Sequence, residues 1–400
     1  MKKFYCRTFQ AIMRVGTAFL PWRKPQMIVG ENTAEELVNI LKKKDISAVM
    51  IVTDAGIVKL GLHLPIFDSL KKANILCAVY DKTIPNPTID NIEEGLTLYR
   101  ENKCQAIIAI GGGSPMDCAK GIGARVVNPR KSISKMRGLL KVGKKLPPLF
   151  AVPTTAGTGS ETTLAAVITD SKTHEKYAIN DPHLIPHFAL LDPYYTKSLP
   201  AGLTASTGMD ALTHAVEAYI GQSNTKETRR SAEQAVKLIF ENLEEVVKNG
   251  SNLVARENMQ KASFLAGVAF TRAYVGNVHS IAHTLGGQYG VPHGLANAII
   301  LPKVLRYYGK TIYKPINMLC EKTGLFLEFL TPQDRTAAFI SWIENLNKKF
   351  GIPETVNSLK NEDIEVLARR ADKESNPLYP VPMIFELNDF INIYKQLLTK

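Results

Sequence analysis

The sequence lacks the features of a secreted, membrane-spanning or repetitive protein. Its five cysteines are odd in number, scattered and never in CxxC spacing, so we expect reduced thiols in a cytoplasmic protein rather than a disulfide framework. It has no internal repeat, no low-complexity tract and no apolar run long enough to span a membrane. With 400 residues, 45% of them hydrophobic, the chain can fill the cores of two domains.

Acidic residues are missing from the two stretches that carry the positive charge. Residues 1–24 contain six Lys or Arg, and residues 130–145 contain seven. Because the formal net charge is +12, the rest of the chain is close to neutral. No helix-turn-helix, zinc finger or aromatic-basic repeat accompanies either stretch, so we expect no nucleic-acid partner.

The first 25 residues predict a basic amphipathic arm. A signal peptide is not expected, because Arg14 interrupts the apolar part and no small-residue cleavage site follows. A helix here would lie either on a membrane surface or against protein, its own or a second subunit, and we favour protein. The apolar positions between the basic residues are Phe4, Cys6, Phe9, Ile12, Met13 and Phe19.

From Met27 onward, short apolar strands alternate with helices. Nearly continuous apolar strands in repeated βα units are typical of a parallel sheet covered on both faces. Residues 165–170 and 176–181 predict a β-hairpin. The sheet strands are expected at 48–56, 75–81, 106–110, 149–153 and 188–193, with helices at 33–43 and 89–102 among the connections.

Two polar, glycine-rich loops follow strands of this sheet. Residues 111–117 (GGGSPMD) open a helix, where backbone N–H groups can approach a phosphate. Met116 stands where the GxGxxG fingerprint requires glycine, so the alternative interpretation of this loop is a purely structural turn. The second loop is residues 154–161 (TTAGTGSE), and its alternative interpretation is a solvated turn. Two such loops at the carboxyl ends of parallel strands mark the place where doubly wound sheets bind nucleotides.

Strand signals stop after residue 193, and the rest of the chain is helical. We therefore predict an α/β N-terminal dinucleotide-binding domain with a parallel sheet, residues 26–195, followed by an all-α C-terminal domain, residues 196–400. Helices are expected at 204–220, 226–248, 256–272, 294–308, 333–349 and 385–399.

Three of the eight histidines fall within residues 276–297. His279 and His283 are four residues apart and would share one face of a helix. A bend beyond that helix would let His293 fold back toward them. The residues expected to end the helix and turn the chain are Gly286, Gly287, Gly290 and Pro292.

A second helical segment, residues 208–220, places Asp210 and His214 at the same four-residue spacing. An isolated HxxxH pair is more often structural than metal-binding. The addition of a DxxxH helix and a third histidine beyond a turn makes metal binding the favoured interpretation. A carboxylate and several imidazoles form the ligand set of a divalent transition metal, and the residue types do not choose among Zn, Fe, Co and Ni. We predict a metal site.

Four segments of the chain resemble the motifs of the iron-containing (group III) alcohol dehydrogenases: GGGSPMD, PTTAGTGSE, MDALTHAVEAY and HSIAHTLGGQYGVPHGLAN. Lactaldehyde reductase, 1,3-propanediol dehydrogenase and butanol dehydrogenases belong to that family. The resemblance covers about residue 25 to the C-terminus, and only the basic N-terminal arm falls outside it. It implies a dehydroquinate synthase-like architecture, with an NAD-binding domain over 26–195 and a helical metal-binding domain over 196–400. One departure is Asn376-Pro377-Leu378-Tyr379, where many relatives have Arg after Pro.

The resemblance also implies roles for individual residues. His283 would be the catalytic histidine near the nicotinamide, and Fe²⁺ would be the metal, with Zn²⁺ as a common substitute. The metal ligands would be Asp210, His214, His279 and His293. The NAD contacts would come from Asp54, Asn86, Gly112, Gly113, Ser114, Asp117, Thr154, Thr155, Thr158 and Lys176.

The implied function is that of an NAD-dependent alcohol dehydrogenase or aldehyde reductase (EC 1.1.1) acting on a small primary alcohol or diol. A metal held by one carboxylate and three neutral imidazoles keeps positive charge, so it favours an alkoxide or polarises a carbonyl, while His283 relays the proton. Asp54, at the end of the first strand, would bind the ribose hydroxyls and favour NAD over NADP; a helix cap is its alternative. We expect a homodimer or higher homo-oligomer.

One rival function is that of a membrane-surface or scaffold protein driven by the N-terminal arm, with catalysis lost, and the complete ligand set argues against that loss. Enzymes of the same fold provide the other rival functions. A dehydroquinate synthase-like activity would need several basic residues around the metal, and only Arg272 is near these motifs in sequence. A glycerol dehydrogenase-like activity is the other alternative.

Overall fold

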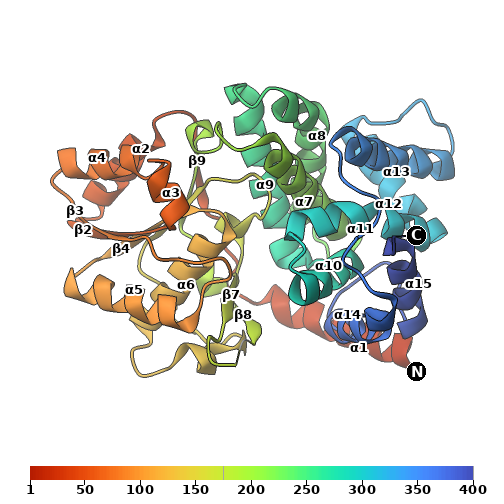
Figure 1. Ribbon diagram of the computed structural model, residues 1–400, viewed down its shortest axis with the longest axis horizontal. Coiled ribbons are helices and arrows are strands. Elements are labelled where there is room, and N and C mark those ends of the chain that lie inside the picture. Colours follow the sequence, from red (N-terminus) through yellow and green to blue (C-terminus); the bar gives the residue numbers. More distant parts are fainter. Residues whose placement is uncertain (174, 400) are drawn as a thin grey trace. The chain divides into compact units, whose positions relative to one another are not determined.

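The computed structural model describes residues 1–173 and 175–399. These residues form two compact units (Figure 1). Unit 1 consists of Met1–Leu20, Pro200–Gly250 and Lys261–Lys400, and unit 2 consists of Pro21–Leu199 and Ser251–Gln260.

Unit 2 is built around a six-stranded parallel sheet. Its four central strands, β9, β6, β4 and β2, consist entirely of buried residues. This confirms the predicted parallel sheet, which is covered on both faces. The strands lie in the order β1 (Gln26–Val29), β9 (Phe188–Leu191), β6 (Leu149–Pro153), β4 (Ala106–Gly111), β2 (Ala48–Val52) and β3 (Leu76–Tyr80).

Two layers of helices cover the two faces of this sheet. Alternate side chains of β2 enter different cores, since Met50 packs with Ile92 and Ile122 on one face while Ile51 packs with Leu37 on the other. The helices of unit 2 are α2 (Thr33–Lys43), α3 (Ala55–Lys59), α4 (Leu64–Lys72), α5 (Ile89–Glu101) and α6 (Gly113–Val127).

The strand order reverses between β2 and β4. The chain runs from β2 outward to β3, and then returns to add β4, β6 and β9 on the other side of β2. In doubly wound sheets the ligand site lies beyond the carboxyl ends of the strands at such a reversal. The predicted loops 111–117 and 154–161 follow β4 and β6, so both lie at that end of the sheet.

A smaller, three-stranded sheet completes unit 2. Strands β7 (Ala165–Thr169) and β8 (Lys176–Asn180) pair antiparallel, which confirms the predicted hairpin, and β5 (Gly138–Leu139) pairs parallel with β8.

Short 3-10 helices occur in both units, at Ile133–Met136, Ser160–Thr162, Pro182–Leu184, Pro193–Tyr195, Gly309–Ile312 and Asn361–Asp363.

Unit 1 is helical, and no strand occurs among the described residues after Leu191. The six predicted helices are confirmed with ends shifted by at most a few residues, whereas α12 and α14 were not predicted. None of the described helices is long and apolar enough to cross a membrane. The helices are α1 (Lys2–Ala18), α7 (Ala201–Ile220), α8 (Lys226–Lys248), α9 (Leu253–Ala273, which continues from unit 2), α10 (Asn277–Tyr289), α11 (His293–Tyr308), α12 (Tyr313–Thr323), α13 (Pro332–Lys349), α14 (Ile364–Ser375) and α15 (Leu387–Leu397).

His187 joins the loop before β9 to the start of β6. The backbone N–H of Leu149 donates to Nδ1 of His187 at 3.1 Å, and the N–H of His187 donates to the carbonyl of Leu149 at 2.9 Å. Burial, together with the nearby charges of Arg23, Lys44 and Lys145, lowers the pKa of His187 to about 4. The imidazole is therefore neutral in the folded protein.

We predict that His187 makes the protein sensitive to mild acid. Its folded pKa, about 4, lies below the ordinary value of 6.5, so the unfolded chain binds the proton first as the pH falls. The contribution of neutral His187 to the free energy of unfolding is full above pH 6.5 and is lost as the pH falls toward 4. Between pH 7 and pH 5 the free energy of unfolding should fall by about 2 kcal/mol more in the wild type than in His187→Asn. Denaturant titrations at the two pH values measure this, and equal losses in both proteins would contradict it.

Candidate metal centre and cofactor loops

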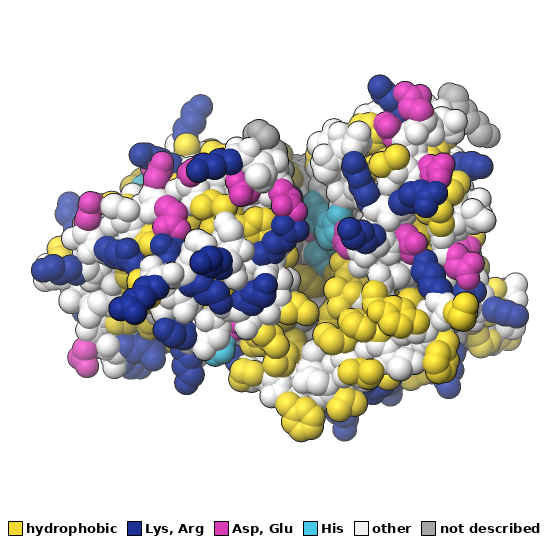
Figure 2. Space-filling model, turned by 90° about the horizontal axis from the view of Figure 1, so that it is seen from below, with side chains coloured by type: hydrophobic (Ala, Val, Ile, Leu, Met, Phe, Trp, Pro, Cys, Tyr) yellow, Lys and Arg dark blue, Asp and Glu magenta, His cyan; other side chains and the backbone are white. Residues whose placement is uncertain are grey.

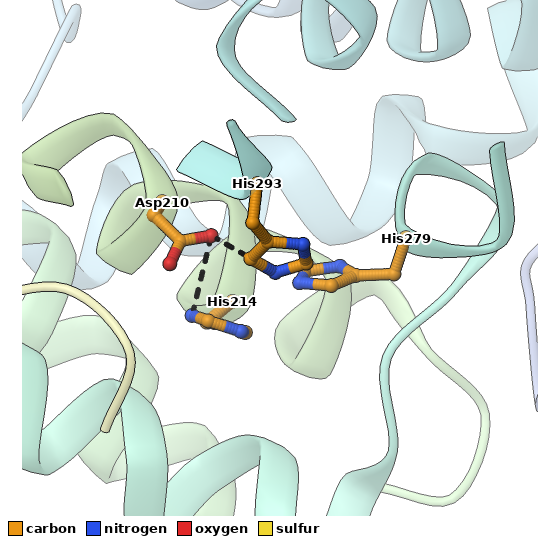
Figure 3. Close-up of side chains that lie close together, drawn as sticks. All are labelled: Asp210, His214, His279 and His293. Atoms are coloured by element: carbon orange, nitrogen blue, oxygen red, sulfur yellow. Dashed lines mark ion pairs between the residues drawn. The ribbon is translucent and has the colours of Figure 1, made fainter. Parts of the chain in front are cut away.

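Four side chains from three helices converge in unit 1, as Figure 3 shows. Asp210 and His214 lie one turn apart on α7, His279 lies on α10, and His293 is the first residue of α11. Each offers one ligand atom, and these four atoms all lie within 4.8 Å of one another. The first three residues are buried, while the side chain of His293 is 41% exposed. The cluster is the predicted one.

The bend between α10 and α11 brings His293 back toward α7. Helix α10 continues through Gly286 and Gly287 and ends before Gly290, whose φ is 68°, so only the later part of the predicted turn ends the helix. Gly294 then packs against α7, because a Cβ at this position would lie 2.5 Å from the carbonyl oxygen of Ser206. A side chain there would push α11 away from α7 and His293 away from the cluster.

The potential ligand atoms point at a common centre. Oδ1 of Asp210 lies 3.5 Å from Nε2 of His293 and 4.0 Å from Nδ1 of His214. The amide nitrogen of Asn297 lies 2.7 Å from Oδ1 of Asp210, 3.2 Å from Nε2 of His279 and 3.1 Å from Nε2 of His293. The amide nitrogen of Asn297 therefore lies within hydrogen-bonding distance of three of the four potential ligand atoms.

Glu217 fixes the orientation of His279. Its Oε2 lies 2.6 Å from Nδ1 of His279 and accepts a hydrogen bond from the N–H of Gly276, while Oε1 accepts one from the N–H of Val278. Because a carboxylate accepts here, Nδ1 carries the proton and the lone pair of Nε2 faces the cluster. Gly276 permits this contact, since a Cβ there would lie 2.6 Å from Oε1 of Glu217.

The electrostatics favour a neutral imidazole at His279. Burial lowers the pKa of His279 well below its ordinary value, and the neighbouring rings of His214, His293 and His283 lower it further. Burial raises the pKa of Glu217 to about 7, against the hydrogen bonds from Gly276, Val278 and His279. Neutral imidazole is the form that binds a metal. Three imidazoles and one buried carboxylate fit a divalent transition metal.

His283 lies beside the cluster but outside the group of four. Its side chain is 44% exposed, and its ring stacks on that of His293 with centroids 5.3 Å apart. Nδ1 of His283 lies 2.6 Å from Oε1 of Glu374, and the hydroxyl of Tyr379 donates to the same oxygen at 2.8 Å.

Sequence reasoning missed three polar neighbours of these histidines. Glu217 and Asn297 follow His214 and His293 by three and four residues, so helical spacing was a signal for both. Glu374 is 91 residues from His283, and no spacing rule connects them.

The two glycine-rich loops of unit 2 lie against each other. Gly112 is the N-cap of α6, and a Cβ added to it would lie 3.7 Å from Oγ1 of Thr155. A Cβ on Gly113 would likewise lie 3.8 Å from Cγ2 of Thr158. The N–H of Thr154 donates to the carbonyl of Gly111 at 3.1 Å. The start of α6, with its free N–H groups, is thus bordered by threonine side chains.

Three more predicted cofactor residues are joined by hydrogen bonds. The N–H of Asn86 donates to Oγ of Ser114 at 3.2 Å, and Nζ of Lys176 donates to Oδ1 of Asn86 at 2.6 Å. The structure therefore brings the turn after β3, the start of α6 and the hairpin strand β8 together.

The two predicted aspartates are engaged within the protein. Asp54 follows the second strand of the chain, not the first, because β1 was not predicted; its Oδ1 accepts from the N–H of Ile57 at 3.0 Å and caps α3. The cap that sequence analysis kept as an alternative is therefore present. Asp117 accepts from Oγ of Ser160 at 3.3 Å and from the N–H of Val167 at 3.1 Å.

Lys120, which sequence reasoning also missed, holds the second loop to α6. It follows Asp117 by three residues on the same helix, and it is fully buried. Its Nζ donates to the carbonyls of Ser160 and Ala165 and to Oγ1 of Thr163, at 2.8, 2.9 and 2.7 Å. Burial lowers the pKa of Lys120 to about 8, although Asp117 raises it.

Sequence comparisons link this geometry to known proteins. The family model described as iron-containing alcohol dehydrogenase matches residues 24–193, and the C-terminal model of the Fe-containing alcohol dehydrogenase family matches residues 204–398. A 1,3-propanediol dehydrogenase of Klebsiella pneumoniae is 41% identical over 331 residues, 82% of this chain and 85% of the relative. An NAD-dependent methanol dehydrogenase of Bacillus methanolicus is 38% identical over 365 residues, 90% and 95%. The lactaldehyde reductase of Escherichia coli K12 is 35% identical over 345 residues, 86% and 90%.

Solved structures agree with this. A crystal structure of 1,3-propanediol oxidoreductase matches with a TM-score of 0.90 and 36% identity, covering 95% of this chain and 100% of that one. Sulfoacetaldehyde reductase from Bifidobacterium kashiwanohense, solved in complex with NAD⁺, matches with a TM-score of 0.84 and 28% identity, covering 95% and 98%. With the motifs, the fold and the cluster of Asp210 and three histidines in agreement, the chain belongs to the iron-containing alcohol dehydrogenase family.

Proposed function

We propose that the protein is an NAD-dependent, iron-containing alcohol dehydrogenase that interconverts a small primary alcohol or diol and its aldehyde. The observation that carries this proposal is the convergence of Asp210, His214, His279 and His293 on one centre. The relatives support it, since they are named for the oxidation of methanol and 1,3-propanediol and the reduction of lactaldehyde. They do not favour a dehydroquinate synthase-like or glycerol dehydrogenase-like activity.

The four converging residues would hold Fe²⁺, and Zn²⁺ fits the same donors. A divalent metal bound there supplies Lewis-acid stabilisation of an alcohol or carbonyl oxygen. Asp210 contributes one negative charge and the imidazoles none, so the site keeps positive charge. Glu217 holds His279 in the tautomer whose Nε2 is free to bind.

His283 is the group that we propose moves the proton. Nδ1 of its ring is held by Glu374, which leaves Nε2 to accept the proton of the alcohol or return it to the aldehyde. Because the His283 side chain is 44% exposed, Nε2 can exchange that proton with solvent. Glu374 and Tyr379 position the ring and do not themselves contact the reacting atoms.

Unit 2 would bind NAD at the carboxyl ends of β2, β4 and β6. The N–H groups of Gly112, Gly113 and Ser114 at the start of α6 suit the pyrophosphate, because a helix N-terminus attracts anions. The hydroxyls of Thr154, Thr155 and Thr158 and the polar ends of Asn86 and Lys176 border that position. Asp54 would accept hydrogen bonds from the adenosine ribose, while Asp117 holds Ser160 of the second loop in place.

The same proposal assigns functions to parts of the chain. Residues 26–195 would be the NAD-binding domain, residues 196–400 the helical metal-binding domain, and residues 1–25 a separate arm. We further propose a cytoplasmic enzyme that forms a homodimer or a higher homo-oligomer.

Metal analysis of histidine variants tests the metal ligands. His279→Ala and His293→Ala should each lose bound metal and turnover, because a four-ligand site loses its geometry together with one bond. His283→Ala should keep the metal and lose most of its turnover, a decrease of about 10²–10⁴-fold. An empty His283→Ala protein beside a metal-loaded His279→Ala protein would reverse the two roles.

Glu217→Gln should weaken metal binding by about 10–100-fold, since the amide keeps the size of the side chain but no longer holds Nδ1 of His279 as a carboxylate does. Competition with a chelator measures the dissociation constant. Glu233→Gln is the matched control, because its carboxylate accepts a hydrogen bond from Tyr219 away from the four ligands. Equal affinity in the Glu217 and Glu233 variants would show that Glu217 does not position His279.

The wild type should prefer NAD over NADP by about two to three orders of magnitude, because the 2′-phosphate would lie close to the carboxylate of Asp54. Asp54→Gly should narrow this gap with metal content unchanged, and glycine at an N-cap costs only about a few tenths of a kcal/mol. Asp54→Asn keeps the cap of α3 and removes the charge, so it should narrow the gap as well. Equal kcat/KM for NADH and NADPH in the wild type would refute the role of Asp54.

A further inference from the structure

Helix α1 is attached to unit 1 through its polar side. Nζ of Lys2 pairs with the carboxylate of Asp372 at 2.6 Å. The guanidinium of Arg7 donates to two backbone carbonyls of residues 377–382, at 2.9 and 3.0 Å, and the amide of Gln10 donates to two others at 3.1 and 2.7 Å. The side that faces the protein is therefore held by hydrogen bonds and an ion pair.

The opposite side of α1 is apolar and faces solvent. A surface helix ordinarily turns its apolar side to the core, so α1 has the reverse orientation. Figure 2, which views the molecule from the side on which α1 lies in Figure 1, shows hydrophobic side chains gathered on this part of unit 1. The outward side chains, spaced to share one helix face, are Phe4, Tyr5, Ile12, Val15 and Phe19, with exposures of 79%, 60%, 66%, 63% and 84%.

Basic residues border this apolar face. Lys3, Arg7 and Arg14 recur at intervals of four and seven residues, which places them along one edge of the helix. Arg14 is exposed and forms no ion pair with any described residue, and Lys3 makes only a 3.6 Å contact with Glu386. Residues 1–24 contain no acidic residue. The face thus combines aromatic and aliphatic groups with positive charge.

The family relationship does not account for this surface. The matched family region begins at residue 24, so α1 precedes the part of the chain that the family model matches. The four metal-site residues and the cofactor loops contact none of its outward side chains among the described contacts. The exposed face is therefore separate from the residues to which we assign the dehydrogenase chemistry.

We propose that α1 docks the protein on the surface of an anionic lipid bilayer. The outward Phe, Tyr, Ile and Val side chains enter the boundary between headgroups and acyl chains, where amphipathic helices bury their apolar face. Lys3 and Arg14, on the edge of that face, lie at the level of the lipid phosphates. The polar side of α1 stays on unit 1, so the contact is peripheral and no segment crosses the membrane.

A second copy of the chain is a less suitable occupant. A helix of 17 residues is about 25 Å long and offers a contact strip about 10 Å wide. Such a strip buries about 300 Å² on each partner, well below the roughly 800 Å² of a specific stable interface. Pairing two arms would also bring their basic edges together without an acidic residue in either arm. An anionic surface, in contrast, attracts them.

Sedimentation of the full-length holoenzyme with lipid vesicles tests the proposal. The wild type should bind vesicles made of equal parts phosphatidylglycerol and phosphatidylcholine, and bind pure phosphatidylcholine weakly. The combined change Phe4→Ser, Ile12→Ser and Phe19→Ser should lower the partition coefficient by at least about tenfold. Lys3→Gln with Arg14→Gln should lower it by about fivefold for each charge, and only for the anionic vesicles.

The matched control changes three exposed apolar residues elsewhere. Leu76→Ser, Val254→Ser and Leu330→Ser, with exposures of 72%, 71% and 90%, should bind vesicles as the wild type does. Metal content and turnover in solution, which all variants should retain, establish that each is folded. The proposal is overturned if the wild type does not bind anionic vesicles, or if the α1 variant binds them equally well. It is also overturned if the control variant loses binding to the same extent, or if the α1 change abolishes self-association in sedimentation while the wild type ignores vesicles.

Discussion

The metal site depends on how closely α7, α10 and α11 approach one another. Its four candidate ligands come from segments separated by up to 83 residues, and their potential ligand atoms lie within 4.8 Å of one another. Two glycines permit this approach, since a Cβ on Gly294 would meet the backbone of α7 at 2.5 Å and one on Gly276 would meet Glu217 at 2.6 Å. A larger residue at either position would separate the helices that supply the ligands. The site is therefore specified by the packing of backbones before any metal binds.

In unit 2 the candidate cofactor site consists of loops, so its geometry depends on the contacts that hold those loops in place. Here the buried ammonium of Lys120 donates to the carbonyl of Ser160 in the second loop, to the hydroxyl of Thr163 just after it, and to the carbonyl of Ala165 at the start of β7. These hydrogen bonds fix the end of the loop to α6. Asp117, one turn earlier on α6, holds the hydroxyl of Ser160 in the same loop. The pair fixes the geometry of the loop that we propose borders the cofactor, and a buried lysine tolerates its desolvation only because its ammonium is hydrogen-bonded.

The sequence predicted the parts of the fold that rest on local periodicity. The buried strands were found because apolar runs such as Ala106–Ile110 leave no other placement. Spacing of four residues placed Asp210 with His214, and His279 with His283, on shared helix faces. The choice of His293 rather than His283 as the fourth candidate ligand came from the family resemblance. Strand β1 was missed because it is a mostly exposed edge strand without a buried apolar run, and its partner β9 lies far along the chain. Glu374 and the carbonyls that bind α1 were beyond reach for the same reason: contacts between distant segments depend on tertiary packing, for which spacing gives no signal.

Residues 376–382, which follow α14, contact both helix α1 and the carboxylate of Glu374, which lies beside His283. The carbonyl of Tyr379 accepts from Gln10 on α1, while its hydroxyl donates to Glu374, the carboxylate that holds His283. This is also the segment where the family resemblance led us to expect Arg after Pro377, and where the chain has Leu378. Because one residue supports both the arm and the positioning of His283, α1 is fixed relative to the helices of unit 1 rather than tethered by a linker. A surface that binds the outer face of α1 would consequently hold unit 1 in one orientation, with its metal ligands at a constant distance from that surface.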